Sequence, residues 1–197
     1  MKIYDISQEV LSCDVYPQDP VPKANKIFSI ESGDLYNLSE FSMCAHNGTH
    51  VDTPLHFIKN GKAIDEIELS QFVGAAFVVS CEGLLEANDA EKILAKVREV
   101  SNEASKRILM KGNATVTDSF AKVLADSGIL LLGVESQSVG PIDAPMSTHL
   151  ILLGKGVVLL EGVRLYDVPD GEYLLCAAPL NLLGFEGSPC RAILIEM

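Results

Sequence analysis

The chain is organised around the run Cys44-Ala-His46-Asn-Gly48-Thr-His50-Val-Asp52-Thr-Pro54-Leu-His56. Three of the four histidines in the 197 residues lie in the eleven positions from 46 to 56, with a carboxylate among them. Imidazole nitrogens and carboxylate oxygens are the side-chain ligands of borderline divalent ions such as zinc and manganese. The run therefore predicts a metal site.

The shape of this run follows from the reach of the chain. A straight strand would place all four candidate ligands on one face, but ten extended residues cover roughly 33 Å, whereas metal bonds measure about 2 Å. A helix would turn Asp52 away from His50, and the β-branched residues and the proline disfavour one. We expect a bend at Gly48, an extended pair at His50 and Asp52, and a turn at Pro54 that returns His56 toward the site.

Length and composition limit the number of domains and the class of protein. With 48% hydrophobic and 21% charged residues, residues 1–197 are expected to form a single domain with a sizeable core. No apolar run approaches about 18 residues, so we expect no membrane span. The N-terminal residues have no apolar signal core and are expected to form a strand, so nothing suggests export.

The net charge limits the classes of binding partner, and the cysteines indicate the cellular location. The formal net charge of −12 disfavours nucleic acid and anionic membranes, which both require basic patches. The five cysteines, at positions 13, 44, 81, 176 and 190, have no paired spacing. They predict reduced thiols and a cytoplasmic protein. Cys44 is either a spare metal ligand or a small buried residue.

Apolar patterning predicts a mixed architecture. Strands are expected over residues 2–7, 25–31, 36–43, 75–81, 107–110, 129–134, 157–160, 172–177 and 191–195. Helices are expected over 65–72, with Asp65 as cap and Glu68 completing a capping box, over 88–100 with Asp89 near the start, over 117–127 closed by Gly128, and around His149 with Ser147 as cap. Eight to ten strands and three or four helices favour an α/β fold with a mixed β-barrel-like core and flanking helices.

Further ligands are expected from the distant part of the sequence. His149 is the fourth histidine, and Glu161 ends the apolar strand 157–160. A carboxylate that closes a buried strand needs a compensating partner, and a metal ion would be one. The alternatives are a structural histidine and a surface or salt-bridged glutamate.

The pattern H-x-G-T-H-x-D-x-P-x-H of residues 46–56 resembles the signature of the metal-dependent cyclase-like hydrolases, the group of bacterial kynurenine formamidase and isatin hydrolase. The resemblance extends to the twelve-residue spacing of His149 and Glu161, to Leu160-Glu161-Gly162, and to the segment 187–191. It implies the swivelling β/β/α fold of that family, which agrees with the expected strands and helices.

The resemblance also implies roles for individual residues. His46, His50 and Asp52 would hold a first divalent ion, and Asp52 and Glu161 would bridge to a second ion completed by His149. Zinc is the first expectation for both ions, with manganese as the alternative. His56 would be the catalytic proton-transfer residue and not a ligand.

The activity implied is hydrolysis of the C–N amide bond of a small molecule through a metal-activated water. The first substrate to consider is N-formylkynurenine, an arylformamidase reaction of tryptophan catabolism, and the alternative is a cyclic amide or lactone such as isatin. Tyr16 occupies the position of a family tryptophan that packs on the substrate, thirty residues before His46. Tyr16 is either a substrate-stacking residue or a loop anchor. The family also implies a homo-oligomer, a dimer or a tetramer.

Two other classes remain open. One is a metal-binding protein without catalysis, which would have no use for a non-ligand histidine beside the metals. The other is a structural zinc site, whose removal by a chelator would unfold the protein. A serine hydrolase is not indicated, because the pattern Gly-x-Ser-x-Gly is absent.

Overall fold

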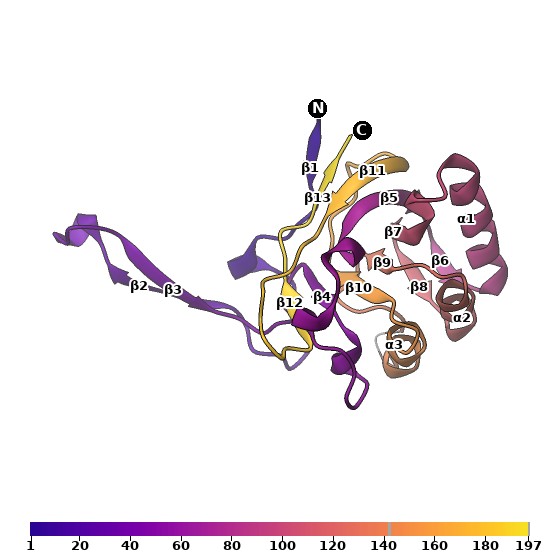
Figure 1. Ribbon diagram of the computed structural model, residues 1–197. Helices are drawn as coiled ribbons and strands as arrows, with labels where there is room; N and C mark the ends of the chain where they lie inside the picture. The colour runs from indigo at the N-terminus through magenta and orange to yellow at the C-terminus, as the bar shows by residue number, and fades with distance from the viewer. Residues whose placement is uncertain (142, 197) are drawn as a thin grey trace.

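A curled sheet of nine strands forms the centre of the protein in the computed structural model, which describes residues 1–141 and 143–196 (Figure 1). In spatial order its strands are β1 (Ile3–Asp5), β13 (Ile193–Ile195), β11 (Gly171–Cys176), β5 (Val73–Ser80), β7 (Arg107–Lys111), β9 (Leu131–Val134), β10 (Val158–Glu161), β4 (His50–Asp52) and β12 (Gly187–Pro189). Strands β5, β7, β9 and β10 run parallel, and antiparallel strands flank them on both sides.

Three helices cover one face of the parallel strands: α1 (Ala87–Val100), α2 (Asp118–Asp126) and α3 (Met146–Leu153) (Figure 1). On β7, Ile108 and Met110 face this layer, while Leu109 between them faces the inside of the curl. The sheet is therefore buried on both faces, as the continuous apolar strands of a parallel sheet require. The α/β fold with a mixed barrel-like sheet and flanking helices is confirmed.

Two small sheets complete the fold. Strands β6 (Gly83–Leu85) and β8 (Ala114–Val116) pair beside the helices. Strands β2 (Lys23–Phe28) and β3 (Leu38–Ser42) form a long two-stranded ribbon that projects from the body of the molecule (Figure 1). The thirteen strands of the described residues exceed the eight to ten predicted, because β6, β8 and β12 have three residues each and no readable alternation.

The ends of α1 and α2 follow the sequence prediction. At the start of α1, the Asp89 carboxylate accepts a hydrogen bond from the backbone N–H of Glu86. At the start of α2, the Thr117 hydroxyl accepts one from the N–H of Phe120. Gly128 follows α2 in the left-handed region, at φ 81°, which glycine adopts without strain.

The predicted helix over residues 65–72 is wrong. Two 3₁₀ turns, Ile64–Glu66 and Leu69–Gln71, occupy this segment, and the Asp65 carboxylate accepts a hydrogen bond from Gly184 instead of capping a helix. The buried guanidinium of Arg107 donates to the carbonyls of Ser70, Gln71 and Ala75. These bonds tie the end of the segment and the start of β5 to β7.

The predicted cap at Ser147 is also wrong. Helix α3 begins at Met146, directly after Pro145, and the Ser147 hydroxyl donates to the Asp118 carboxylate at 2.6 Å. A proline fits the start of a helix because its fixed φ is already helical and its missing N–H would have no partner there. None of the three helices in the described part of the chain is long and apolar enough to span a membrane.

We predict that Arg107→Met lowers the free energy of unfolding by about 3 kcal/mol, because it removes the charged hydrogen bonds that a buried guanidinium makes to three carbonyls. Chemical denaturation measures this change. Arg98→Met is the matched control, since Arg98 is exposed and donates to the single carbonyl of Ser127; its change should stay within about 0.5 kcal/mol. Equal effects of the two substitutions would contradict the role of Arg107.

Candidate metal centre

The register of β4 against β10 brings the two halves of the site together. His50 lies opposite Glu161, and Asp52 lies opposite Leu159. Helix α3, which precedes β10 in the chain, carries His149 to the same place. The structure therefore assembles the ligands predicted from residues 46–56 with the two predicted from the distant part of the sequence.

The motif has the bent shape predicted from its residue types. The chain turns after His46 and passes Gly48 at φ 64°. It then runs extended from His50 to Asp52 and returns through the 3₁₀ turn Pro54–His56. Gly48 lies so close to Cys13 that a Cβ at this position would be 2.8 Å from that of Cys13, so glycine is required by both conformation and space.

The first group of ligand atoms comes from the motif alone. His46, His50 and Asp52 offer ligand atoms that all lie within 4.8 Å of one another. His46 Nδ1 is 2.8 Å from Asp52 Oδ1, and His50 Nε2 is 3.4 Å from the same oxygen. The Glu186 carboxylate lies on the other side of the His46 ring, 3.3 Å from Nε2.

The second group combines Asp52 with His149 and Glu161, again within 4.8 Å. His149 Nε2 is 3.4 Å from Glu161 Oε1 and 3.7 Å from Asp52 Oδ2. The second oxygen of Glu161 is 3.4 Å from His50 Nε2. Asp52 thus belongs to both groups, and Glu161 lies between His50 and His149.

Backbone carbonyls set the orientation of two rings. His50 Nδ1 donates to the Gly48 carbonyl at 3.0 Å, and His149 Nδ1 donates to the Pro145 carbonyl at 2.8 Å. Each bond fixes the proton on Nδ1 and turns Nε2 toward the carboxylates. This is the arrangement of metal-binding histidines, in which the non-ligating nitrogen donates to a carbonyl or carboxylate.

The donor set fits divalent ions. His50, Asp52, His149 and Glu161 are each exposed by at most 2%, and buried carboxylates need compensating charge. Oδ2 of Asp52 has no hydrogen-bond partner among the described residues. An orphaned carboxylate oxygen between imidazole nitrogens is where a bound cation would supply the missing interaction.

Protonation of the metal-free site follows from the same contacts. Burial opposes the charged form of His46, but the hydrogen bond and charge of Asp52, with Glu186, raise the pKa of His46 to about 9. Against the same burial, Glu161 and Asp52 raise the pKa of both His50 and His149. The pKa of Asp52 is lowered, because its histidine neighbours outweigh its burial.

His56 belongs to neither ligand group. Its half-buried ring stacks on His46 with centroids 4.0 Å apart and lies 6.1 Å from the ring of His149. Burial lowers the pKa of His56, and the charge of Asp52 does not restore it. Burial thus favours the neutral form of this imidazole, which lies beside the two ligand groups.

A cavity of about 350 Å³ opens onto these rings. Tyr16 lies on its wall, as do Phe57 and the predicted spare ligand Cys44. Cys44 is half-buried and belongs to neither ligand group. All five cysteines are free thiols, as predicted.

Two glutamines, which the sequence did not predict as site residues, hydrogen-bond the motif to the chain around Gly162. Gln137 donates to the carbonyls of His46 and Gly48, and accepts from Gln8 at 3.1 Å. Gln8 also donates to the Gly162 carbonyl at 2.8 Å. The polar loop 135–141 was the only sequence signal, since glutamines are common and these contacts span more than 80 residues.

The Cyclase family model matches residues 4–141 of the chain. The chain belongs to this family. The match includes the whole 46–56 motif and ends before His149 and Glu161.

Two kynurenine formamidases extend the comparison. The chain is 35% identical to kynurenine formamidase of Salinibacter ruber over 172 residues, which cover 80% of this chain and 79% of that protein. It is 30% identical to kynurenine formamidase of Polaromonas naphthalenivorans, over 100% of this chain and 92% of that protein.

Solved structures agree with the fold. A potential metal-dependent hydrolase with cyclase activity has a TM-score of 0.80 at 28% identity, covering 98% of this chain and 96% of that one. Isatin hydrolase A from Labrenzia aggregata has a TM-score of 0.84 at 22% identity, covering 100% and 94%. At that identity the second likeness concerns the fold alone.

We predict that Gly162→Ala lowers the free energy of unfolding by about 3 kcal/mol or more and reduces metal content. The strain of a left-handed backbone at a residue with a Cβ and the clash of that Cβ with a neighbouring backbone both contribute to the loss. Gly162 has φ 68°, and a Cβ there would lie 2.3 Å from the Gly48 carbonyl oxygen. Denaturation and elemental analysis measure the two effects.

Gly156→Ala is the matched control, since Gly156 has φ 79° but no atom within 4 Å of a Cβ. It should cost only the conformational strain of about 1–2 kcal/mol and leave metal content unchanged. Equal behaviour of the two variants would show that the contact between Gly162 and Gly48 does not matter to the site.

We also predict that metal binding at pH 7 releases protons. His46, with a pKa of about 9 in the metal-free site, holds a proton at pH 7, whereas coordination needs an unprotonated imidazole. Apparent affinity should therefore rise with pH between 7 and 9, by up to about tenfold per pH unit for each proton released. Calorimetry in buffers of different ionisation enthalpy counts these protons; a count of zero at pH 7 would contradict the prediction.

Proposed function

We propose that this chain is a metal-dependent amidohydrolase that cleaves the C–N amide bond of a small molecule, with an arylformamidase reaction on N-formylkynurenine as the first activity to test. The observation that carries the proposal is the shared carboxylate. Asp52 belongs to two adjacent groups of buried ligand atoms, and the non-ligand His56 stands beside both on the wall of a cavity.

In this proposal His46, His50 and Asp52 hold one divalent ion, and Asp52, Glu161 and His149 hold the second. Zinc is the first expectation and manganese the alternative, because nitrogen and carboxylate ligands suit both. When bound, such ions supply an activated water and polarise the substrate carbonyl.

His56 is the proposed proton-transfer residue. Its imidazole takes a proton from the attacking water and delivers it to the leaving amide nitrogen as the C–N bond breaks, so that a formamide yields formate and an amine. Its stacking on His46 holds the ring beside the ligands. No described hydrogen bond occupies its ring nitrogens, which leaves them available for this transfer.

The cavity supports a small aromatic substrate. Its volume of about 350 Å³ lies in the range of small-molecule sites, and the rings of Phe57 and Tyr16 form part of its wall. We propose Tyr16 as a substrate-stacking residue. The kynurenine formamidase relatives favour N-formylkynurenine, and a cyclic amide or lactone such as isatin is the alternative.

The test adds zinc or manganese to metal-stripped protein and assays N-formylkynurenine, isatin and a panel of amides and lactones. Metal-dependent release of formate from N-formylkynurenine supports the arylformamidase assignment. Turnover of isatin alone moves the assignment to cyclic substrates. Binding of metal with no turnover on the panel identifies a metal-binding protein without catalysis, and unfolding on chelation identifies a structural metal site.

We predict that His56→Ala keeps both metal ions and lowers kcat by about 10²–10⁴-fold, the usual contribution of general acid–base catalysis. Elemental analysis and steady-state kinetics measure the two quantities. A loss of metal along with activity would mean that His56 is a ligand.

Glu161→Gln is the contrasting variant, because it removes a ligand charge at a buried position. It should lower metal occupancy, whereas His56→Ala should not. Unchanged stoichiometry in Glu161→Gln would remove Glu161 from the ligand set.

Four further expectations stay predictions: one domain over residues 1–197, a cytoplasmic location, a homo-oligomeric state, and a place in tryptophan catabolism. The five free thiols support the cytoplasmic location.

A further inference from the structure

Glu186 is a carboxylate beside the metal motif that neither ligand group includes. It directly precedes β12, the edge strand of the central sheet, which pairs with β4 so that Gly187 lies opposite Asp52. Oε1 of Glu186 is 3.3 Å from Nε2 of His46, across 140 positions of sequence. The end of the chain thus brings a charged acceptor to the first predicted ligand.

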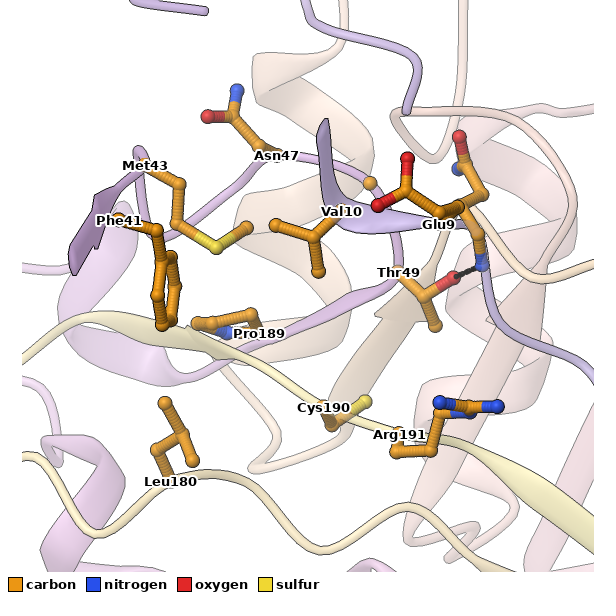
Figure 2. A pocket seen from close by; sticks show the side chains of 12 residues that line it. Glu9, Val10, Phe41, Met43, Asn47, Thr49, Leu180, Pro189, Cys190 and Arg191 are labelled. Atoms are coloured by element: carbon orange, nitrogen blue, oxygen red, sulfur yellow. Dashed lines mark hydrogen bonds between the residues drawn. The ribbon is translucent and has the colours of Figure 1, made fainter. Parts of the chain in front are cut away.

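The backbone at Glu186 is fixed by the motif itself. The N–H and the hydroxyl of Thr53 both donate to the Glu186 carbonyl, at 3.0 and 2.9 Å, and Thr53 is fully buried. Directly after β12, the Cys190 N–H donates to the Thr49 carbonyl at 3.1 Å, where the two residues lie side by side (Figure 2). Residues before and after the ligand pair of β4 therefore hold this segment in place.

The next residue, Gly187, leaves room for the His46 ring. A Cβ at Gly187 would lie 2.6 Å from Cε1 of His46 and 2.8 Å from the Val51 carbonyl oxygen, so only glycine allows the ring to lie against this backbone. The ring of His56 also stacks on His46, with centroids 4.0 Å apart and planes 23° apart. These contacts place the His46 ring, but they do not determine which of its nitrogens carries the proton.

The ring of His46 is oriented differently from those of the other two predicted histidine ligands. In His50 and His149, Nδ1 donates to a backbone carbonyl and Nε2 faces the carboxylates. In His46, Nδ1 faces the ligand group, 2.8 Å from Asp52 Oδ1, and Nε2 faces Glu186. Asp52 is itself a ligand in the proposed site. Because an ionised carboxylate only accepts hydrogen bonds, Glu186 is the acceptor that remains for a ring proton.

We propose that Glu186 is the positioning residue of His46. Its carboxylate accepts the proton on Nε2, so that His46 offers Nδ1 to the metal, whereas His50 and His149 offer Nε2. A carboxylate in this role fixes the orientation of the ring and strengthens its other nitrogen as a ligand. Because His56 stacks on the same ring, Glu186 also sets the place of the proposed proton-transfer residue. This role rests on the metal site of the proposed function.

The proton positions are tested by NMR on zinc-loaded protein with ¹⁵N-labelled histidine. The chain has four histidines, so long-range ¹H–¹⁵N spectra separate every ring. We expect two zinc-bound rings with the proton on Nδ1 and one with the proton on Nε2. In Glu186→Ala the proton of this last ring should exchange faster with water, because it has lost its acceptor. A zinc-bound His46 that carries its proton on Nδ1 would overturn the proposal.

Zinc affinity provides a second readout. Glu186→Ala should weaken the binding of one of the two ions by about 10–100-fold, because His46 belongs to only one ligand group. Competition with a zinc chelator measures both affinities. The Glu186 side chain is exposed by 41%, so its removal should leave the protein folded, which circular dichroism checks. Unchanged zinc affinity in the folded variant would overturn the proposal.

Glu186→Gln is the conservative variant. Its side-chain amide keeps an oxygen that can accept from Nε2 of His46, but it lacks the negative charge. It should therefore retain the proton on Nε2 and lose less zinc affinity than Glu186→Ala. An equal loss in both variants with the proton moved to Nδ1 would show that the oxygen at this position does not hold the ring.

Asp65→Ala is the matched control. Asp65 is an exposed carboxylate that accepts from the Gly184 N–H at 2.7 Å, in the segment that leads to Glu186. Its removal loosens this segment but keeps the Glu186 carboxylate, so zinc affinity and the proton position of His46 should stay as in the wild type. An equal loss of zinc affinity in Asp65→Ala and Glu186→Ala would mean that the backbone of the segment positions the ring, which would overturn the proposal.

Turnover is measured separately, so that the two proposals can fail independently. If the zinc-loaded wild type has the expected proton positions but hydrolyses nothing on the substrate panel, the hydrolase activity is refuted and the role of Glu186 stands. If it hydrolyses a substrate while His46 carries its proton on Nδ1, the role of Glu186 is refuted and the activity stands.

Discussion

The antiparallel pairing of β4 with β10 is the contact on which the candidate site depends. It places His50 opposite Glu161 and fixes Asp52 two residues further along. Because side chains alternate along a strand, a slip of one residue would turn His50 and Asp52 to the opposite face. The register is held by Val51 and Leu160, which are paired and fully buried, and by the Thr49 hydroxyl, which donates to the Gly162 carbonyl at 2.8 Å.

The same pairing concentrates unfavourable charge at one point. Asp52 and Glu161 are removed from water and lie among imidazoles that compete for the same oxygens. Stability alone would favour apolar residues here. Neighbouring backbone groups orient these side chains by hydrogen bonds. The Val139 N–H donates to the Glu161 carboxylate at 2.6 Å, and the Pro145 carbonyl accepts a hydrogen bond from the His149 ring. Such local conflict between burial and polarity is characteristic of functional positions.

The sequence made the local half of the site predictable. Gly48 and Pro54 each restrict the backbone in a known way, and the ligand types between them limit the chemistry. The pairing of Glu161 with His50 is a long-range contact that no local pattern contains. Only the likeness to a known family assigned Glu161 and His149 to the same site as Asp52. Periodicity identified β2 and β3 as strands but carried no information about their projection from the body. The segment 65–72 was mispredicted as a helix; its end is held by Arg107, a contact over more than 30 residues that no local pattern contains.

The second ligand group has a consequence for the unfolded chain. Asp52 is 97 residues before His149 and 109 before Glu161 in the sequence, so an ion held by all three closes a loop of about 100 residues. A covalent bridge over such a loop removes roughly 4–5 kcal/mol of chain entropy from the denatured state. An ion held there would act as a reversible crosslink between parts of the chain about 100 residues apart.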